Sequence, residues 1–94
     1  MTKAELITKI AGKTGVEKIT VSAIVESMMN EIKESVISNE AVFLRGFGTF
    51  KAKKRAEKTA RNIKKNTTII VPSHYTPAFK PAKDFVNSTK TTIK

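Results

Sequence analysis

The sequence predicts an α+β fold: two N-terminal helices, a three-stranded antiparallel sheet with a long protruding β-arm, and a short C-terminal helix. Apolar residues recur at helical spacing within residues 3–36, and strand-like β-branched and aromatic runs occupy residues 41–45 and 67–71. Between these runs, residues 51–65 contain eight Lys or Arg and one acid. Because such a run cannot build its own core, it predicts a solvated two-stranded ribbon.

The length of 94 residues suits a single domain over residues 1–94. We expect a helical dimerisation base in residues 1–40, the sheet and arm in residues 41–79 with the arm tip near residues 60–67, and a C-terminal helix and tail in residues 80–94. A lone chain of this size buries only about 60–65% of its unfolded surface, so pairing would stabilise it. Without Cys, disulfides and thiol chemistry are excluded. No apolar run reaches the ~18 residues of a membrane helix, so we expect a cytoplasmic protein with no membrane partner.

The positive charge is confined to the second half of the chain. The net charge is +10. Residues 1–40 have five lysines and six glutamates, whereas residues 41–94 have thirteen Lys or Arg and two acids. This asymmetry favours nucleic acid as the partner over an acidic membrane surface. An ordinary domain with a solvated charged face is the remaining alternative.

Both expected helices have recognisable ends. Thr2 and Glu5 form a capping box before a first helix over residues 3–13, and Gly15 suits its left-handed C-terminal position. The second helix should end at Asn39. Its apolar stripe comprises Val21, Ile24, Val25, Met28, Ile32 and Val36.

The second helix does not have the positive charge of the recognition helix of a DNA-binding helix-turn-helix motif. The second helix exposes Glu26, Glu31 and Glu34, and Lys33 is its one clear base beyond the first turn. Phosphate would repel this surface, so we assign the helices to scaffolding and dimerisation.

A glycine-rich turn follows the first strand. Gly46 and Gly48 flank Phe47, which suits a tight turn and leaves backbone N–H groups open to an anion. The helical stripe and the phenylalanines carry more apolar surface than one chain could hide, which predicts a dimer. The phenylalanines expected in the dimer core are Phe43, Phe47, Phe50 and Phe79.

The C-terminal segment predicts a last strand and a helix. Pro81 suits the first turn of a helix that extends to about Thr89, and Lys80 and Lys83 would then lie at its N-terminal end, where a phosphate is favoured. His74 has no acid or second His near it in the sequence, so we expect a surface residue and no catalytic, metal or cofactor site. The protein is not expected to be an enzyme.

Several motifs together resemble the bacterial histone-like family that contains HU and integration host factor. They are Gly46-Phe47-Gly48-Thr49-Phe50, Arg55, Arg61-Asn62, Pro72, Pro77-Ala78-Phe79 and Lys80-Pro81-Ala82-Lys83. The resemblance covers essentially the whole chain and implies a nucleoid-associated, intertwined homodimer or heterodimer. In that family a saddle of strands and two β-arms embrace double-stranded DNA in the minor groove and bend it with an apolar wedge, as is known for HU and integration host factor.

The chain departs from the family pattern at three positions. Ile63 replaces the wedge proline, which keeps an apolar side chain but loses the fixed φ. Asn66 replaces the turn glycine and tolerates positive φ. Val86 stands where HU members often have Lys, which removes one expected phosphate contact.

The resemblance and the alternation of basic residues define the expected DNA contacts. Lys51, Lys53 and Arg55 alternate onto one strand face, Lys58 and Arg61 continue towards the tip after an irregularity near residues 56–57, and Lys54 points the other way. Expected phosphate contacts are Lys3, Gly46, Gly48, Lys51, Lys53, Arg55, Lys58, Arg61, Lys80 and Lys83. The expected minor-groove and wedge residues are Arg61, Asn62 and Ile63.

Two other functions remain open. Integration-host-factor-like binding with site preference is one, and Arg45 before the turn resembles the arrangement in one subunit of that factor. A basic RNA-binding protein is the other, although the arm lacks the exposed aromatics on which single-stranded bases stack.

Overall fold

The computed structural model describes residues 1–62 and 67–93 and confirms the α+β class. It contains two compact units, Met1–Glu34 and Ser35–Lys94. In chain order, the elements of this part of the chain are α1 (Lys3–Thr14), α2 (Lys18–Ile37), β1 (Val42–Leu44), β2 (Gly48–Arg55), β3 (Lys58–Asn62), β4 (Thr67–Val71), β5 (His74–Pro81) and α3 (Lys83–Thr92).

The first unit is helical, and its ends follow the sequence signals. Thr2 Oγ1 accepts a hydrogen bond from the backbone N–H of Glu5 at 3.2 Å, and α1 ends at Gly15 with φ +73° in the left-handed region. Ile7 and Val21 are buried within this unit. The expected N-cap at Thr2 and the left-handed glycine are therefore confirmed.

The end of α2 is a Schellman motif. Asn39 has φ +60°, its N–H donates to Val36 O at 2.9 Å, and the N–H of Glu40 donates to Ser35 O at 2.8 Å. Asn is one of the few residues that adopt this conformation at modest cost. The expectation that Asn39 ends the helix is correct.

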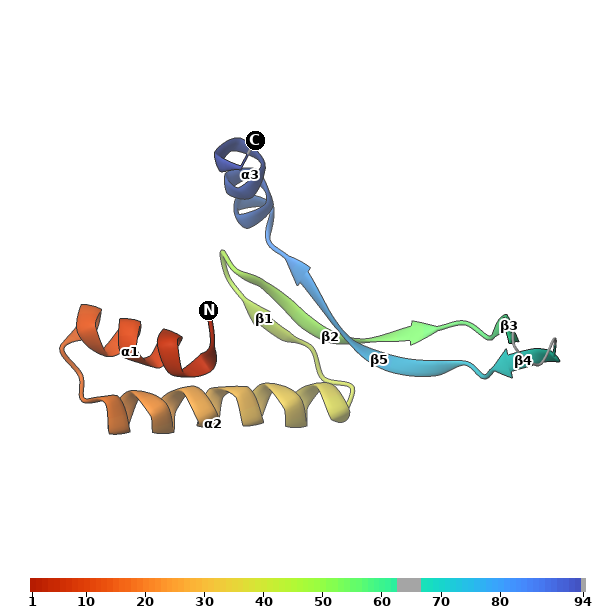
Figure 1. The fold of residues 1–94 in the computed structure, drawn as a ribbon, viewed down its shortest axis with the longest axis horizontal. Helices are drawn as coiled ribbons and strands as arrows, with labels where there is room; N and C mark the ends of the chain where they lie inside the picture. Colours follow the sequence, from red (N-terminus) through yellow and green to blue (C-terminus); the bar gives the residue numbers. More distant parts are fainter. Residues whose placement is uncertain (63–66, 94) are drawn as a thin grey trace. The chain divides into compact units, whose positions relative to one another are not determined.

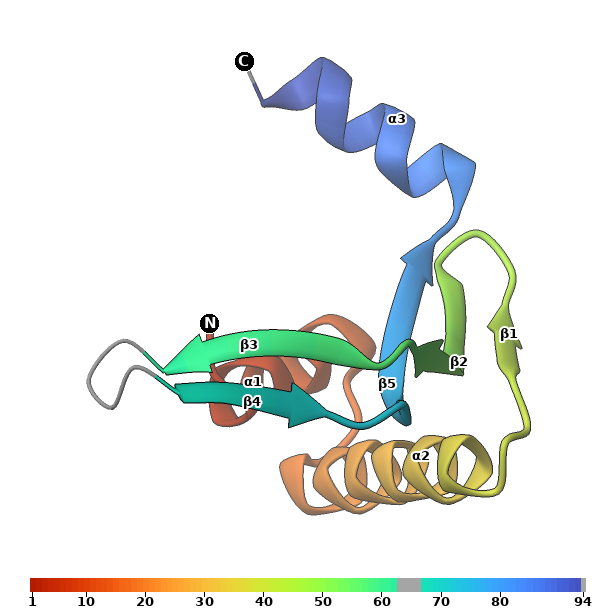
Figure 2. The same ribbon diagram turned by 90° about the vertical axis from the view of Figure 1, so that its right-hand side faces the viewer.

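The second unit contains two antiparallel sheets. The strand order in the first is β1-β2-β5, and the second is the β3-β4 pair. Figures 1 and 2 show β2 between β1 and β5. Residues 56–57 and 72–73 interrupt the ribbon between the two sheets, so the expected irregularity near Ala56 and Glu57 is present on both strands.

The start of the last helix differs from the prediction. Pro81 is the last residue of β5, in register with Gly48, and α3 begins at Lys83 and extends to Thr92. Pro81 lies at the end of the ladder, where the missing N–H is tolerated. The N–H of Ala82 then donates to Phe47 O at 2.9 Å, which fixes the chain against the turn before α3 starts.

The core of a single chain is small. Among the described residues, the buried hydrophobic side chains are Ile7, Val21 and Val36. Within the same residues, no helix is long and apolar enough to cross a membrane.

Candidate nucleic-acid interface

The three-stranded sheet has two chemically different faces. Register pairs Phe43 with Thr49 and Thr49 with Lys80, so these three residues form one row across the sheet. Side chains alternate along a strand, so every second residue shares that face. We call it the cationic face; its residues are Phe43, Thr49, Lys51, Lys53, Arg55, His74, Thr76, Ala78 and Lys80.

Lys54 lies on the opposite face, as the sequence predicts. It is in register with Tyr75, whereas its neighbours Lys53 and Arg55 are in register with Thr76 and His74. Residues two apart in a strand are about 6.6–6.8 Å apart, so Lys51, Lys53 and Arg55 form a regular line of exposed cations.

The opposite face carries an aromatic cluster. Its members are Phe47, Phe50, Phe79 and Phe85. The ring centroids of Phe50 and Phe79 are 4.7 Å apart, those of Phe47 and Phe79 are 5.2 Å apart, and those of Phe47 and Phe85 are 5.7 Å apart. Such tilted and stacked pairs hold the turn, the end of β5 and the start of α3 together.

Phe43 does not join this cluster. It lies on the cationic face and is 78% exposed, whereas its neighbours Val42 and Leu44 are partly covered. The sequence analysis grouped Phe43 with Phe47, Phe50 and Phe79 in the expected dimer core. Strand alternation places Phe43 one residue out of phase with Val42, which is in register with Phe50.

Each glycine of the turn has its own structural reason. Gly46 has φ +79°, which a side chain disfavours. At Gly48, an added Cβ would lie 2.5 Å from Phe79 Cε1 and 2.6 Å from Lys80 O. Close packing against β5 thus accounts for glycine at position 48 without any ligand.

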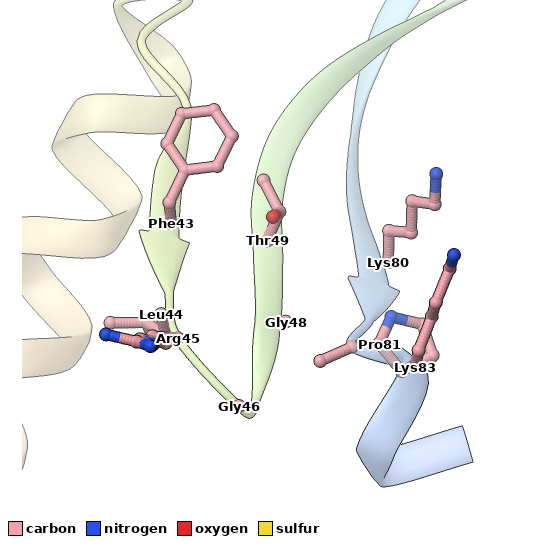
Figure 3. A pocket seen from close by; sticks show the side chains of 10 residues that line it. Phe43, Leu44, Arg45, Gly46, Gly48, Thr49, Lys80, Pro81 and Lys83 are labelled. Atoms are coloured by element: carbon pink, nitrogen blue, oxygen red, sulfur yellow. The ribbon is translucent and has the colours of Figure 1, made fainter. Parts of the chain in front are cut away.

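A hollow of about 430 Å³ surrounds this turn and brings several predicted contacts together (Figure 3). Gly46, Gly48, Lys80 and Lys83 all line it, although the prediction derived them from separate motifs. Its further lining residues are Phe43, Leu44, Arg45, Thr49, Pro81 and Ala82. Three cations, Arg45, Lys80 and Lys83, therefore border one open concavity.

The arm continues the basic series along β3. Lys58 is in register with Val71, and Arg61 with Thr68. Asn62 ends β3, and the expected wedge Ile63 lies outside the described residues.

Lys3 is placed in α1 of the helical unit, where its ammonium forms an ion pair with Glu26 of α2. Both side chains are about half exposed, so a phosphate can compete for this lysine. Sequence periodicity gave no signal for this pair, because it joins two helices.

The fold and site define a polyanion-binding protein that presents a cationic sheet face and a basic arm, rather than a basic helix. The chain belongs to the bacterial DNA-binding protein family, whose model matches residues 1–90. It is 41% identical over 90 residues to the SPbeta prophage-derived DNA-binding protein HU 2 of Bacillus subtilis, covering 96% of this chain and 98% of that protein. It is 34% identical to DNA-binding protein HU of Xylella fastidiosa, covering 96% of each.

Solved structures support the same assignment. The fold matches a chain of an Anabaena HU–DNA cocrystal structure with a TM-score of 0.88 and 33% identity, over 100% of both chains. It also matches the V42I mutant of Thermotoga maritima HU with a TM-score of 0.73 and 28% identity, over 95% of this chain and 99% of that one.

Proposed function

We propose that this protein is an architectural DNA-binding protein that grips duplex DNA in the minor groove, bends it, and shows little sequence specificity. The observation that carries the proposal is the cationic face, where Lys51, Lys53, Arg55 and Lys80 share one side of the sheet. Family membership and the HU–DNA cocrystal neighbour support DNA as the polyanion. The site of action is then the nucleoid in the cytoplasm.

Phosphate neutralisation supplies most of the affinity in this proposal. Exposed lysines and arginines at alternating strand positions can follow a backbone of phosphates but do not read base edges. The hollow beside Gly46 adds Arg45, Lys80 and Lys83 at the end of this line. Affinity should therefore depend strongly on salt and weakly on sequence.

Bending is assigned to the arm. HU and integration host factor insert apolar wedges between base steps, and Ile63 holds the corresponding position in this sequence. We assign Arg61 and Asn62 to minor-groove contacts beside it. Unstacking a step costs a few kcal/mol, which extra contacts between the bent duplex and the sheet offset.

The active species in the proposal is a dimer, the assembly of the HU family. Phe47 is 44% exposed and Phe79 39% exposed in the single chain, although both belong to the aromatic cluster. In the helical unit, Ile24 is 61% and Met28 51% exposed on the predicted apolar stripe. A second copy that covers these residues would complete the core that one chain lacks.

A salt titration with matched variants tests the cationic face. Log affinity for a linear duplex should fall linearly with log salt, with a slope of about −0.9 per phosphate neutralised. Lys53→Ala and Arg55→Ala should each reduce this slope by about one per lost phosphate contact and weaken all sequences alike. Lys54→Ala is the control, because it removes the same charge from the other face. Equal effects of Lys53→Ala and Lys54→Ala would refute the assignment.

Site-preferring binding and RNA binding are the competing functions. Competition among duplexes of different sequence measures the site preference of binding. RNA-binding sheets present exposed aromatic rings on which bases stack, and the exposed ring of Phe43 on the cationic face is the feature of this sheet that resembles them. A single ring cannot stack successive bases, which favours the duplex as the ligand.

A further inference from the structure

We infer that Phe43 is a specificity-determining residue that packs against deoxyribose in the minor groove and disfavours duplex RNA. This inference rests on the proposed function, since it assigns a ligand contact within the same face. No other Phe, Tyr or Trp lies on the cationic face, whose strands are all described. A large apolar side chain that is 78% exposed among cations therefore requires an explanation.

The neighbours of Phe43 identify what covers it. Phe43, Thr49 and Lys80 lie in one row on three adjacent strands (Figure 3), and Arg45 borders the same hollow beyond β1. Lys80 and Arg45 border the hollow that Phe43 also lines, and both can bind phosphates. The sugar joins successive phosphates of a strand, so its apolar C–H edge falls between those cations and over the ring.

The alternative cover is the second protein chain. An apolar contact between chains is already available on the opposite face, where the aromatic cluster and the partly covered Val42 and Leu44 lie. Burying the line of Lys51, Lys53 and Arg55 against a like-charged copy would be unfavourable. The charges of this face therefore favour the nucleic acid.

The same geometry distinguishes DNA from RNA. A duplex of RNA displays its 2′-hydroxyl groups in the minor groove. A hydroxyl pressed against the Phe43 ring loses its water and gains no hydrogen-bond partner, which corresponds to roughly a 5- to 150-fold loss of affinity. A deoxyribose has a hydrogen in place of the 2′-hydroxyl and avoids this loss.

The test compares wild type, Phe43→Thr and Phe43→Leu on DNA and RNA duplexes of matched sequence and at matched salt. Thr suits a strand but is polar, and Leu keeps an apolar side chain. We expect Phe43→Thr to weaken DNA binding roughly tenfold, with an unchanged salt slope, and to reduce the preference for DNA over RNA. Phe43→Leu should retain most of both properties.

Three other results would overturn the inference. In the first, Phe43→Thr binds both duplexes as tightly as wild type does. If this variant also unfolds at a lower temperature than wild type, Phe43 lies in the dimer interface instead. A second is a loss confined to nicked or gapped DNA, which would indicate stacking on an exposed base. In the third, the wild-type protein binds the DNA and RNA duplexes with equal affinity and with a steep salt slope. If the wild-type protein showed no salt-dependent DNA binding, that result would instead refute the proposed function.

Discussion

Replacing Gly48 by Ala should destabilise the fold because of contacts that no other glycine of this chain makes. The added Cβ would lie 2.6 Å from Lys80 O, a backbone atom of the paired strand, and 2.5 Å from Phe79 Cε1. The ring cannot easily move, because its centroid is 4.7 Å from that of Phe50 and 5.2 Å from that of Phe47. Overpacking of this kind costs about 1–3 kcal/mol.

Two further Gly→Ala variants separate packing from backbone effects. At Gly12, inside α1, the Cβ meets nothing within 4 Å, so Ala should stabilise by about 0.5–1 kcal/mol. At Gly46 the Cβ also meets nothing, but φ +79° makes Ala cost about 1–2 kcal/mol.

Thermal unfolding followed by circular dichroism, at one fixed protein concentration and without DNA, measures all three variants. A loss of 1 kcal/mol lowers Tm by roughly 4–8 °C in a domain of this size. We expect Tm to fall for Gly48→Ala and Gly46→Ala and to rise for Gly12→Ala. A Gly48→Ala protein as stable as wild type would show that Phe79 yields freely and that the packing argument is wrong.

Three further predictions concern the arm, the assembly and the first helix. Ile63→Ala should reduce bending while leaving weak nonspecific binding nearly intact, and Ile63→Pro should preserve or increase it; energy transfer across an end-labelled duplex at saturation measures this, and an unchanged end-to-end distance for Ile63→Ala would mean that Ile63 is no wedge. Unfolding should depend on protein concentration, and a folded monomer in sedimentation at micromolar concentration contradicts the dimer. Thr2→Ala should cost about 0.5–2 kcal/mol, because the N–H of Glu5 loses its acceptor, whereas Thr2→Ser should be nearly neutral in the same unfolding assay.

Local features of the fold could be predicted because they depend on neighbouring residues. The cap at Thr2, the left-handed residues Gly15 and Asn39, and the break near residue 56 are all correct. The separation of Lys54 from Lys53 and Arg55 also follows from simple alternation.

Features that depend on pairing across the sheet could not be predicted in the same way. Pro81 satisfies the rules for a first helical turn equally well, but its register with Gly48 keeps it in β5. Gly48 is needed because a ring and a carbonyl more than thirty residues later lie against it.

The sequence by itself determined the helices, the strands, the basic arm and the concentration of charge in the second half, because periodicity and composition act over a few residues. Only the tertiary structure decided which side chains of different strands share a face. Register set Phe43 apart from the other phenylalanines and placed it in a row with Thr49 and Lys80. The physical reason is that one residue of strand register moves a side chain to the opposite face, and that register is fixed by contacts between distant segments.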